Sequence, residues 1–320
     1  MGCPHTCSFC DQRSISGSQK PPSPEQVREI CSMAARDIKD KSETEIAFFG
    51  GSFTAIERGY MLSLLEAAKP FVGEGGFKGI RISTRPDCID EGILSVLKGY
   101  GVTVVELGAQ SMSDEVLALN ERGHSSEDTR KASDLIKSFG FELGLQMMTG
   151  LYGSTPELDN FTADEIIKLS PKTVRIYPTA VLEGTRLGEL FKSGEYKPME
   201  SEESAKLCAG LLKKFLDNGI NVIRLGLHAS ELVEGKLIAG TYHPAFRELC
   251  EGLIFREEIE RALCGRSGKF FLQVPAGAQS KAAGHKKSNI EYFAAKGAHI
   301  KIKTLSELCG YNIKLSEEVD

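Results

Sequence analysis

Three cysteines stand within eight residues near the start of the chain, in the run Cys3-Pro4-His5-Thr6-Cys7-Ser8-Phe9-Cys10. Thiols packed this tightly do not suit a disulfide framework. Three thiolates on one loop can ligate three irons of a cubane cluster and leave the fourth iron open to a small chelating molecule. A closed zinc site needs a fourth ligand, which His5 could supply only by folding its ring back between two thiolates. The spacing therefore favours an iron-sulfur cluster over zinc.

Short apolar segments alternate with amphipathic segments along the first 228 residues. Ser23 and Pro24 are residue types that begin a helix, which is expected to run to about Asp40. The expected strands cover residues 45–49, 79–84, 102–107, 143–148, 174–178 and 221–227. Near-continuous apolar strands separated by helices predict a parallel sheet with helices covering it, an α/β fold.

Six to eight such units would let the sheet curl into a partial or full barrel, with its active site at the carboxyl ends of the strands. Unusual residues follow five strands directly: Gly50-Gly51, Thr84-Arg85-Pro86-Asp87, Gln110-Ser111, Gly150 and Tyr177-Pro178. Glycine and proline punctuate any strand end. Five such ends together with the cysteine loop favour one shared site.

Composition limits the alternatives. The chain has 320 residues, 41% of them hydrophobic, which suffices for one large domain and a small one. It has no apolar run long enough for a membrane span and no secretory signal at its N-terminus. The other six cysteines are scattered singly and are expected to be buried free thiols: Cys31, Cys88, Cys208, Cys250, Cys264 and Cys309. We expect a cytoplasmic protein without a membrane partner, because a reducing compartment suits free thiols and an oxygen-sensitive cluster.

The motifs together resemble the radical S-adenosylmethionine (radical SAM) domain of the elongator catalytic subunit family, whose members modify the wobble uridine of transfer RNA. The resemblance covers roughly residues 2–197 in collinear order. The runs that carry it are Gly2-Cys3-Pro4-His5, Cys10-Asp11-Gln12, Phe49-Gly50-Gly51-Ser52-Phe53-Thr54, Thr84-Arg85-Pro86-Asp87, Val105-Glu106-Leu107-Gly108-Ala109-Gln110-Ser111, Leu119-Asn120-Glu121-Arg122-Gly123-His124, Gly153-Ser154-Thr155-Pro156, Ile176-Tyr177-Pro178-Thr179, Glu183-Gly184-Thr185 and Gly194-Glu195-Tyr196-Lys197-Pro198.

The resemblance implies two cofactors, a 4Fe-4S cluster and SAM. Its cluster ligands would be Cys3, Cys7 and Cys10. Gly50 and Gly51 would shape the strand end that receives the SAM amino group, the Phe9 backbone would lie near the adenine, and Gln110 and Arg122 would contact the ribose and the carboxylate. An arginine suits a carboxylate because its planar fork binds it bidentately. Reductive cleavage of SAM would then give a 5'-deoxyadenosyl radical inside a water-excluding barrel.

Three features depart from the family. Ser83, a further cofactor-binding position, stands where an acidic residue is common, so one ribose contact is expected to be absent. The run from Met148 to Gly153 lacks the usual prolines, which is expected to reshape the floor of the substrate pocket. The acetyltransferase domain of full-length members is missing, so the complete carboxymethylating reaction is not assigned to this chain alone, and an acetyltransferase partner in trans is left open.

The start of the chain is also unusual, because only Met1 and Gly2 precede Cys3, whereas the cluster loop of such folds follows the first barrel strand. Either the first strand is absent or the reading frame was opened at an internal methionine. The second explanation is favoured, because an open sheet edge beside the cluster would be a stability liability. On this view residues 1–228 form a partial barrel that lacks its first strand.

Two further regions are expected after the barrel. Residues 229–264 would form a helical extension packed on it, and residues 265–320 a small basic α/β subdomain with strand 270–274, helix 285–296 and strand 299–303, a βαβ unit. Residues 265–303 carry eight Lys or Arg against Glu291, which is +7 and leaves −12 on the rest of a chain of net charge −5. The candidates for nucleic-acid contacts are Lys281, His285, Lys286 and Lys287, with a merely solvated basic face as an equal alternative.

The leading hypothesis is a radical SAM enzyme that acts on RNA, in particular transfer RNA, with ferredoxin or flavodoxin as the electron donor. Whether it is a transferase or an oxidoreductase is left open. One alternative is a radical SAM enzyme on a small molecule, like the oxygen-independent coproporphyrinogen oxidases. Another is a non-catalytic metal-containing RNA-binding protein.

Overall fold

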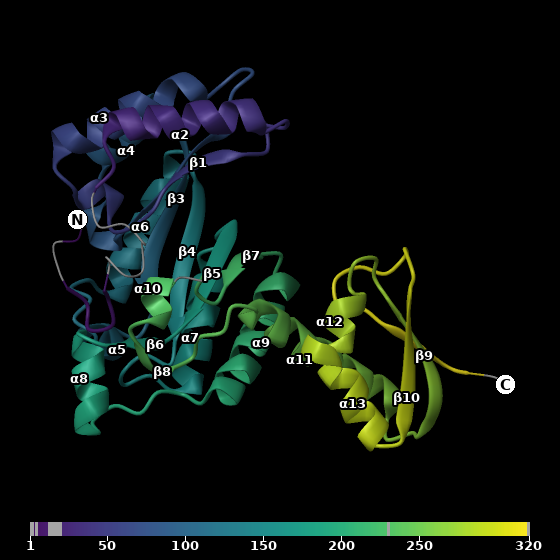
Figure 1. The fold of residues 1–320 in the computed structure, drawn as a ribbon. Coiled ribbons are helices and arrows are strands. Elements are labelled where there is room, and N and C mark those ends of the chain that lie inside the picture. Colours follow the sequence, from purple (N-terminus) through teal and green to yellow (C-terminus); the bar gives the residue numbers. More distant parts are fainter. Residues whose placement is uncertain (1–2, 4–5, 12–20, 229–230, 319–320) are drawn as a thin grey trace.

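The computed structural model describes residues 3, 6–11, 21–228 and 231–318, so His5 and the two residues before Cys3 lie outside it. Its larger part is built on one parallel sheet of six strands, drawn at the left of Figure 1. In order across the sheet these are β1 (Glu45–Phe48), β2 (Gly79–Thr84), β3 (Val102–Gln110), β4 (Glu142–Thr149), β5 (Thr173–Pro178) and β7 (Asn221–Leu225). The predicted α/β partial barrel is confirmed, and each expected strand is present within a few residues of its predicted ends.

Helices connect the strands; most of them cover the outer face of the sheet, whereas the fourth and seventh in the order below, α5 and α8, pack beside the cysteine loop. They are α2 (Pro24–Asp37), α3 (Arg58–Ala68), α4 (Glu91–Gly99), α5 (Asp114–Leu119), α6 (Ser126–Ser138), α7 (Pro156–Lys168), α8 (Arg186–Ser193) and α9 (Ser201–Asp217), with short 3-10 turns η1 (Phe53–Ala55), η2 (Lys69–Phe71) and η3 (Pro86–Cys88). Ser23 caps α2 as its residue type predicts: its hydroxyl accepts from the Gln26 amide while the Gln26 side chain accepts from the Ser23 amide.

The two faces of the sheet differ in chemistry. On β2, Ile80 and Ile82 are fully buried in the main hydrophobic core, which the helices complete. Successive residues of a strand point to opposite faces, so Arg81 and Ser83 lie on the concave interior face instead. The helix-covered face therefore supplies the packing, and the interior face is free to carry polar side chains.

A second, smaller layer closes part of the barrel. The short strands β6 (Ala180–Leu182) and β8 (Leu237–Gly240) pair antiparallel, and the helix α10 (Glu231–Glu234) precedes β8. Val181 and Leu187 pack there with Cys7 and Phe9 in a separate hydrophobic cluster. This cluster attaches the cysteine loop to the barrel. The sequence interpretation missed both short strands.

The C-terminal part follows the long helix α11 (Phe246–Leu263), which joins it to the half-barrel (Figure 1). Its elements are β9 (Gly268–Val274), α12 (Gln279–Ala283), η4 (His285–Lys287), α13 (Ser288–Ala295), β10 (Ala298–Thr304) and β11 (Lys314–Glu317). Strand β9 pairs parallel with β10, which confirms the βαβ unit, and antiparallel with β11, which was not predicted.

The expected helix 285–296 was wrong in its first turn. Lys286 and Lys287 have φ angles of 51° and 67°, which break the helix before α13. The division of the chain at residues 228 and 264 stays a prediction. No helix in the described part of the chain is both long and apolar enough to cross a membrane.

Candidate active site at the open end of the half-barrel

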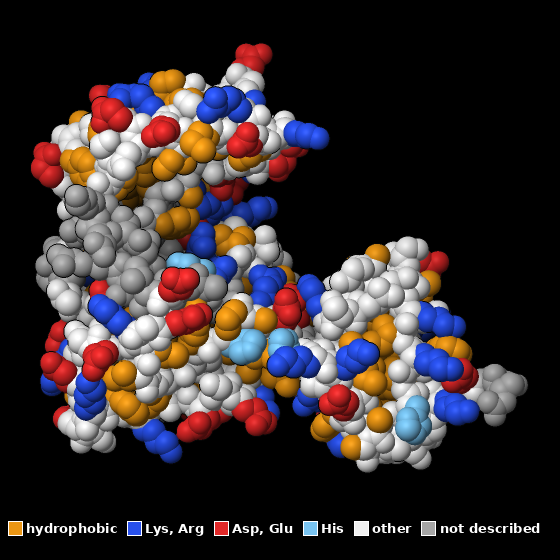
Figure 2. Space-filling view, viewed as in Figure 1, with side chains coloured by type: hydrophobic (Ala, Val, Ile, Leu, Met, Phe, Trp, Pro, Cys, Tyr) orange, Lys and Arg blue, Asp and Glu red, His pale blue; other side chains and the backbone are white. Residues whose placement is uncertain are grey.

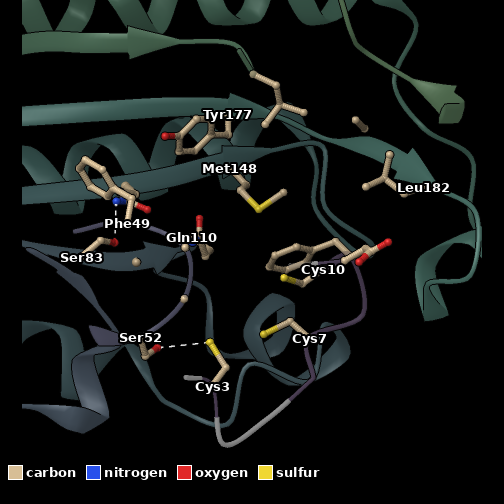
Figure 3. A pocket seen from close by; sticks show the side chains of 18 of the residues that line it. Cys3, Cys7, Cys10, Phe49, Ser52, Ser83, Gln110, Met148, Tyr177 and Leu182 are labelled. Carbon is tan, nitrogen blue, oxygen red and sulfur yellow. Dashed lines mark hydrogen bonds between the residues drawn. The ribbon is translucent and has the colours of Figure 1, made fainter. Parts of the chain in front are cut away.

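A cavity of about 960 Å³ opens at the carboxyl ends of the strands. All nine residues that the sequence proposes for the cluster and for SAM line it: Cys3, Cys7, Phe9, Cys10, Gly50, Gly51, Ser83, Gln110 and Arg122. Figure 3 shows the three thiols along one side and Gln110 directed into the space between them and the sheet. The four basic candidates, Lys281 to Lys287, do not line this cavity. The topology thus gathers residues more than a hundred positions apart, while their roles as ligands stay predictions.

The cysteine loop is held from both sides by backbone and side-chain hydrogen bonds at Ser8. The Ser8 amide donates to the carbonyl of Asn120 at 3.1 Å, and its hydroxyl donates to Asn120 Oδ1 at 2.8 Å. The Leu187 amide donates to the Ser8 carbonyl at 2.7 Å. Ser8 and Asn120 are both fully buried. The loop is therefore positioned by α5 on one side and by α8 on the other.

The three thiols have different surroundings. Cys7 Sγ accepts a hydrogen bond from Arg122 Nη1 at 3.1 Å, and Cys3 Sγ lies 3.5 Å from Ser52 Oγ. Burial, with the charges of Cys7 and Cys3 nearby, raises the pKa of Cys10 to about 12. Within the described residues, no group of three or more His, Cys, Asp or Glu side chains is arranged to hold a metal ion as it stands. The thiols share one cavity wall without converging on a point.

Arg122 is buried, although its place at a helix end would favour a solvated charge. Its Nη2 donates to the carbonyl of Gly108 at 2.6 Å, and its guanidinium lies 5.9 Å from the centroid of the Phe9 ring. Arg85, paired with Asp87 at 2.8 Å, donates to the Arg122 carbonyl. The Thr-Arg-Pro-Asp run thus fixes the backbone of Arg122, whose side chain faces the cysteine loop.

Polar atoms without a partner also face the cavity region. Gln110 Oε1 and Arg122 Nε are buried and accept or donate no hydrogen bond within the described residues. Gln110 itself has φ 64°, at the irregular end of β3, and Gly50 and Gly51 have φ of 108° and 118°. Positive φ angles such as these suit glycine and strain other residues. Strain and unpaired polar groups at one place are typical of a site that binds a polar ligand.

The interior face of the sheet carries a charged network that the sequence interpretation missed. Glu106, only 1% exposed, accepts from Arg81 at 2.9 Å and from Arg175 at 2.7 and 3.1 Å. Gln146 Nε2 donates both to Glu106, at 2.9 Å, and to Ser83 Oγ, at 3.0 Å. These residues come from β2, β3, β4 and β5, and the signal for them was a polar residue within each apolar strand. The network forms the floor of the cavity.

An aromatic ring stands above this floor. Phe49 is half exposed, and the Arg175 guanidinium lies 4.7 Å from its ring centroid. Tyr177 and Met148 line the same side of the cavity, as Figure 3 shows. The cavity therefore combines a thiol wall with an aromatic and cationic wall.

Comparisons with known proteins agree with this geometry. Residues 1–163 match the family model described as the radical SAM superfamily, and residues 171–254 match the radical SAM C-terminal domain. A tRNA uridine(34) acetyltransferase of Methanocaldococcus infernus is 38% identical over 159 residues, 48% of this chain and 30% of that protein. The matched region of this chain thus spans less than a third of the length of that relative.

Solved structures have a similar fold. The archaeal Methanocaldococcus infernus Elp3 with an N-terminal deletion superposes with a TM-score of 0.55 at 29% identity, covering 66% of this chain and 57% of the other. The coproporphyrinogen III oxidase HemN of Escherichia coli superposes with a TM-score of 0.50 at 17% identity, covering 68% of this chain and 51% of the other. The second likeness concerns the fold alone.

Proposed function

Because the chain belongs to the radical SAM superfamily, we propose that it is an enzyme that cleaves S-adenosylmethionine reductively at a 4Fe-4S cluster, and that it acts on a uridine of transfer RNA. The observation that carries the proposal is the meeting of three loop thiols, the Gly50-Gly51 strand end and the unpaired Gln110 Oε1 in one cavity. The RNA substrate is supported by the archaeal relative that is named a tRNA uridine(34) acetyltransferase.

The residues present fit the proposed cofactors. Cys3, Cys7 and Cys10 are the donor set of a cluster with one open iron, and the unpaired Arg122 Nε and Gln110 Oε1 offer a donor and an acceptor to a polar ligand. When bound, the two cofactors would supply a carbon-centred radical that can remove a hydrogen atom from a substrate.

The chain itself has three tasks in this proposal. The Arg122 cation stabilises the Cys7 thiolate through its 3.1 Å hydrogen bond. Phe9, which packs against Val181 and Leu187, gives the loop side of the cavity an apolar lining that excludes water. The network around Glu106 holds Arg175 and Ser83 in place on the floor, where a substrate would lie. Ferredoxin or flavodoxin as the electron donor, and an acetyltransferase acting in trans, complete the proposal.

Cleavage of SAM can be measured directly. The chain, reconstituted anaerobically with iron and sulfide and then reduced, is expected to bind about four irons and to release 5'-deoxyadenosine. Cys7→Ala should abolish both, whereas Cys309→Ala, which alters a thiol outside the cavity, should change neither. The expected burial was wrong for Cys309 and Cys264, which are exposed, and for Cys88, which is half-buried. An iron-loaded chain that releases no 5'-deoxyadenosine would contradict the enzymatic proposal.

The RNA substrate needs its own measurement. Added bulk transfer RNA is expected to stimulate 5'-deoxyadenosine release and to acquire a modified uridine, detected by mass spectrometry of digested nucleosides. If transfer RNA neither stimulates the release of 5'-deoxyadenosine nor acquires a modified uridine, the proposal of an RNA substrate is wrong and a small-molecule substrate is favoured instead.

A further inference from the structure

The outer face of the three-stranded sheet is basic and open to solvent. Strand β9 turns Phe270, Leu272 and Val274 inward, where they are buried in the small core. The side chains of the opposite face, which we name the outer sheet face, are Lys269, Phe271, Gln273, His299, Lys301, Lys303, Lys314, Ser316 and Glu318. The four lysines are all exposed, and Phe271 is partly exposed among them.

The charges on this face are strongly unbalanced. Four lysines stand against Glu318, which pairs with Lys301, so the described residues of the face carry +3. Glu317 lies on the opposite side of β11, where it pairs with Arg266 at 3.1 Å. The rest of the chain is acidic, as its overall net charge of −5 requires. The outer sheet face is therefore a local concentration of positive charge.

An aromatic ring lies at the centre of the charge. Lys303 Nζ is 3.5 Å from the centroid of the Phe271 ring, and Lys301 Nζ is 5.8 Å from it. Lysines on β10 and β11 would protect the edges of a small sheet against pairing with other chains. That role does not explain Phe271, because β9 is the central strand and is paired on both sides.

The Lys303 ammonium group lies over the Phe271 ring, and it is on an exposed, flexible side chain that a base can displace. A ring among lysines on an open sheet suits single-stranded nucleic acid, in which bases stack on aromatic side chains and phosphates meet lysines. An acidic peptide would use the lysines but would gain little from the ring. We propose that the outer sheet face binds a single-stranded segment of RNA, with a base on Phe271 and phosphates at Lys301 and Lys303. The choice of RNA rests on the proposed function.

This proposal moves the RNA contact away from the loop predicted from the sequence. Lys281 is paired with the buried Glu251 at 3.0 Å, and the His285 ring packs edge-on against His243, with centroids 5.4 Å apart. The matched family models end at residue 254, before the sheet begins. Figure 1 shows β9 and β10 on the side of α13 away from the half-barrel, and Figure 2 shows Lys and Arg side chains along that side. The RNA segment bound there would thus lie away from the cavity, where the proposed uridine substrate would bind.

Fluorescence anisotropy with the full chain tests the face, using bulk transfer RNA and a labelled oligouridylate of about ten nucleotides. Lys301→Ala with Lys303→Ala should weaken binding of both at least about tenfold and reduce the slope of log affinity against log salt by about 1.4. Phe271→Leu should weaken binding about tenfold with the slope unchanged. The control pair Lys131→Ala and Lys206→Ala, which removes equal charge from α6 and α9, should stay within about twofold. The loop pair Lys286→Ala and Lys287→Ala should do the same.

Several outcomes would overturn the proposal. Unchanged affinity in Phe271→Leu, equal weakening in the control pair, or weakening confined to the loop pair each exclude this face as a stacking site. Polyglutamate that competes as well as the oligouridylate would indicate an acidic protein partner instead. Release of 5'-deoxyadenosine without RNA should be normal in every face variant. If the wild-type chain releases no 5'-deoxyadenosine, the catalytic proposal is refuted. If a face variant binds RNA more weakly but still releases 5'-deoxyadenosine, the result concerns the outer sheet face alone.

Discussion

Asn120 shows how much of the site depends on one residue that touches no proposed ligand. Its side chain is fully buried, accepts from Ser8 and donates to the carbonyls of Val116 and Tyr152, each at 2.8 Å. It therefore ties the cysteine loop, the end of α5 and the turn after β4 together. Sequence patterns place Asn120 within a motif but do not show its bonds to Ser8 and Tyr152, because these residues come from two distant segments.

Removing this side chain should destabilise the chain markedly. Asn120→Ala leaves the buried Ser8 hydroxyl and the half-buried Tyr152 carbonyl without this partner, whereas the Val116 carbonyl keeps its bond from the Asn120 backbone amide. We expect the free energy of unfolding to fall by about 2–3 kcal/mol. Urea denaturation of the metal-free chain measures the change. The matched control is Asn218→Ala, whose exposed amide donates to the Lys214 carbonyl at 2.9 Å and should cost less than about 1 kcal/mol. Equal losses of unfolding free energy in the two variants would contradict the stabilising role of Asn120.

His124, four residues further on, should make stability depend on pH. Burial, with Arg122 and Arg85 nearby, lowers its pKa from 6.5 to about 4 in the folded chain. Between these values the unfolded chain binds a proton that the folded chain does not. The stability from the neutral ring is thus complete above about pH 6.5 and is lost as the pH falls towards 4.

The expected loss across that window is about 2–3 kcal/mol. His124→Gln can keep the contact with the Ala109 carbonyl, at 3.3 Å in the wild type, but cannot titrate, so its unfolding free energy should change less with pH. Urea denaturation at several pH values measures both chains, with the exposed His299→Gln as the control. If the unfolding free energies of the wild type and His124→Gln change with pH in parallel, the prediction is wrong.

At the scale of elements, the strands were predictable because buried parallel strands leave a continuous apolar run. The interior network was not, since a single Glu or Arg within such a run resembles a surface residue until the register is known. Glu106 and Gln146 meet only because β3 and β4 pair in one register. The helix break at Lys286 was equally invisible, because lysines rarely adopt a left-handed backbone.

The network predicts a large effect of one conservative change. Glu106→Gln removes the carboxylate that the half-buried Arg81 and Arg175 share. Arg81 keeps Glu45 at 2.7 Å, whereas Arg175 loses this ion pair, and we expect the free energy of unfolding to fall by about 2–3 kcal/mol. Added salt should restore little of it, because ions reach a buried site poorly. Glu202→Gln, which breaks an exposed pair with Lys206, should cost less than about 1 kcal/mol. Similar losses in both variants would show that the floor is not held by charge.

At the scale of the whole molecule, one helix belongs to two cores. Cys250 and Ile254 of α11 pack in the core of the half-barrel, whereas Phe255, Ile259 and Leu263 pack in the small core with β9 and β10. The change of composition after Cys264 indicated an appended unit, but it could not show that this unit borrows the second half of the preceding helix. Helix periodicity alone does not say which neighbour covers each face.

This sharing predicts how the molecule unfolds. Phe293→Ala empties a fully buried position of the small core, which typically costs 3–5 kcal/mol, so amides there should exchange at least about a hundredfold faster. Hydrogen exchange with mass spectrometry should show the loss in β9, β10, α13 and the second half of α11, while β3 and β4 stay protected. Leu145→Ala, in the main core, should affect β3 and β4 instead. If Phe293→Ala exposes β3 and β4 equally, the two cores unfold as one, and the predicted division of the chain near residue 264 is wrong.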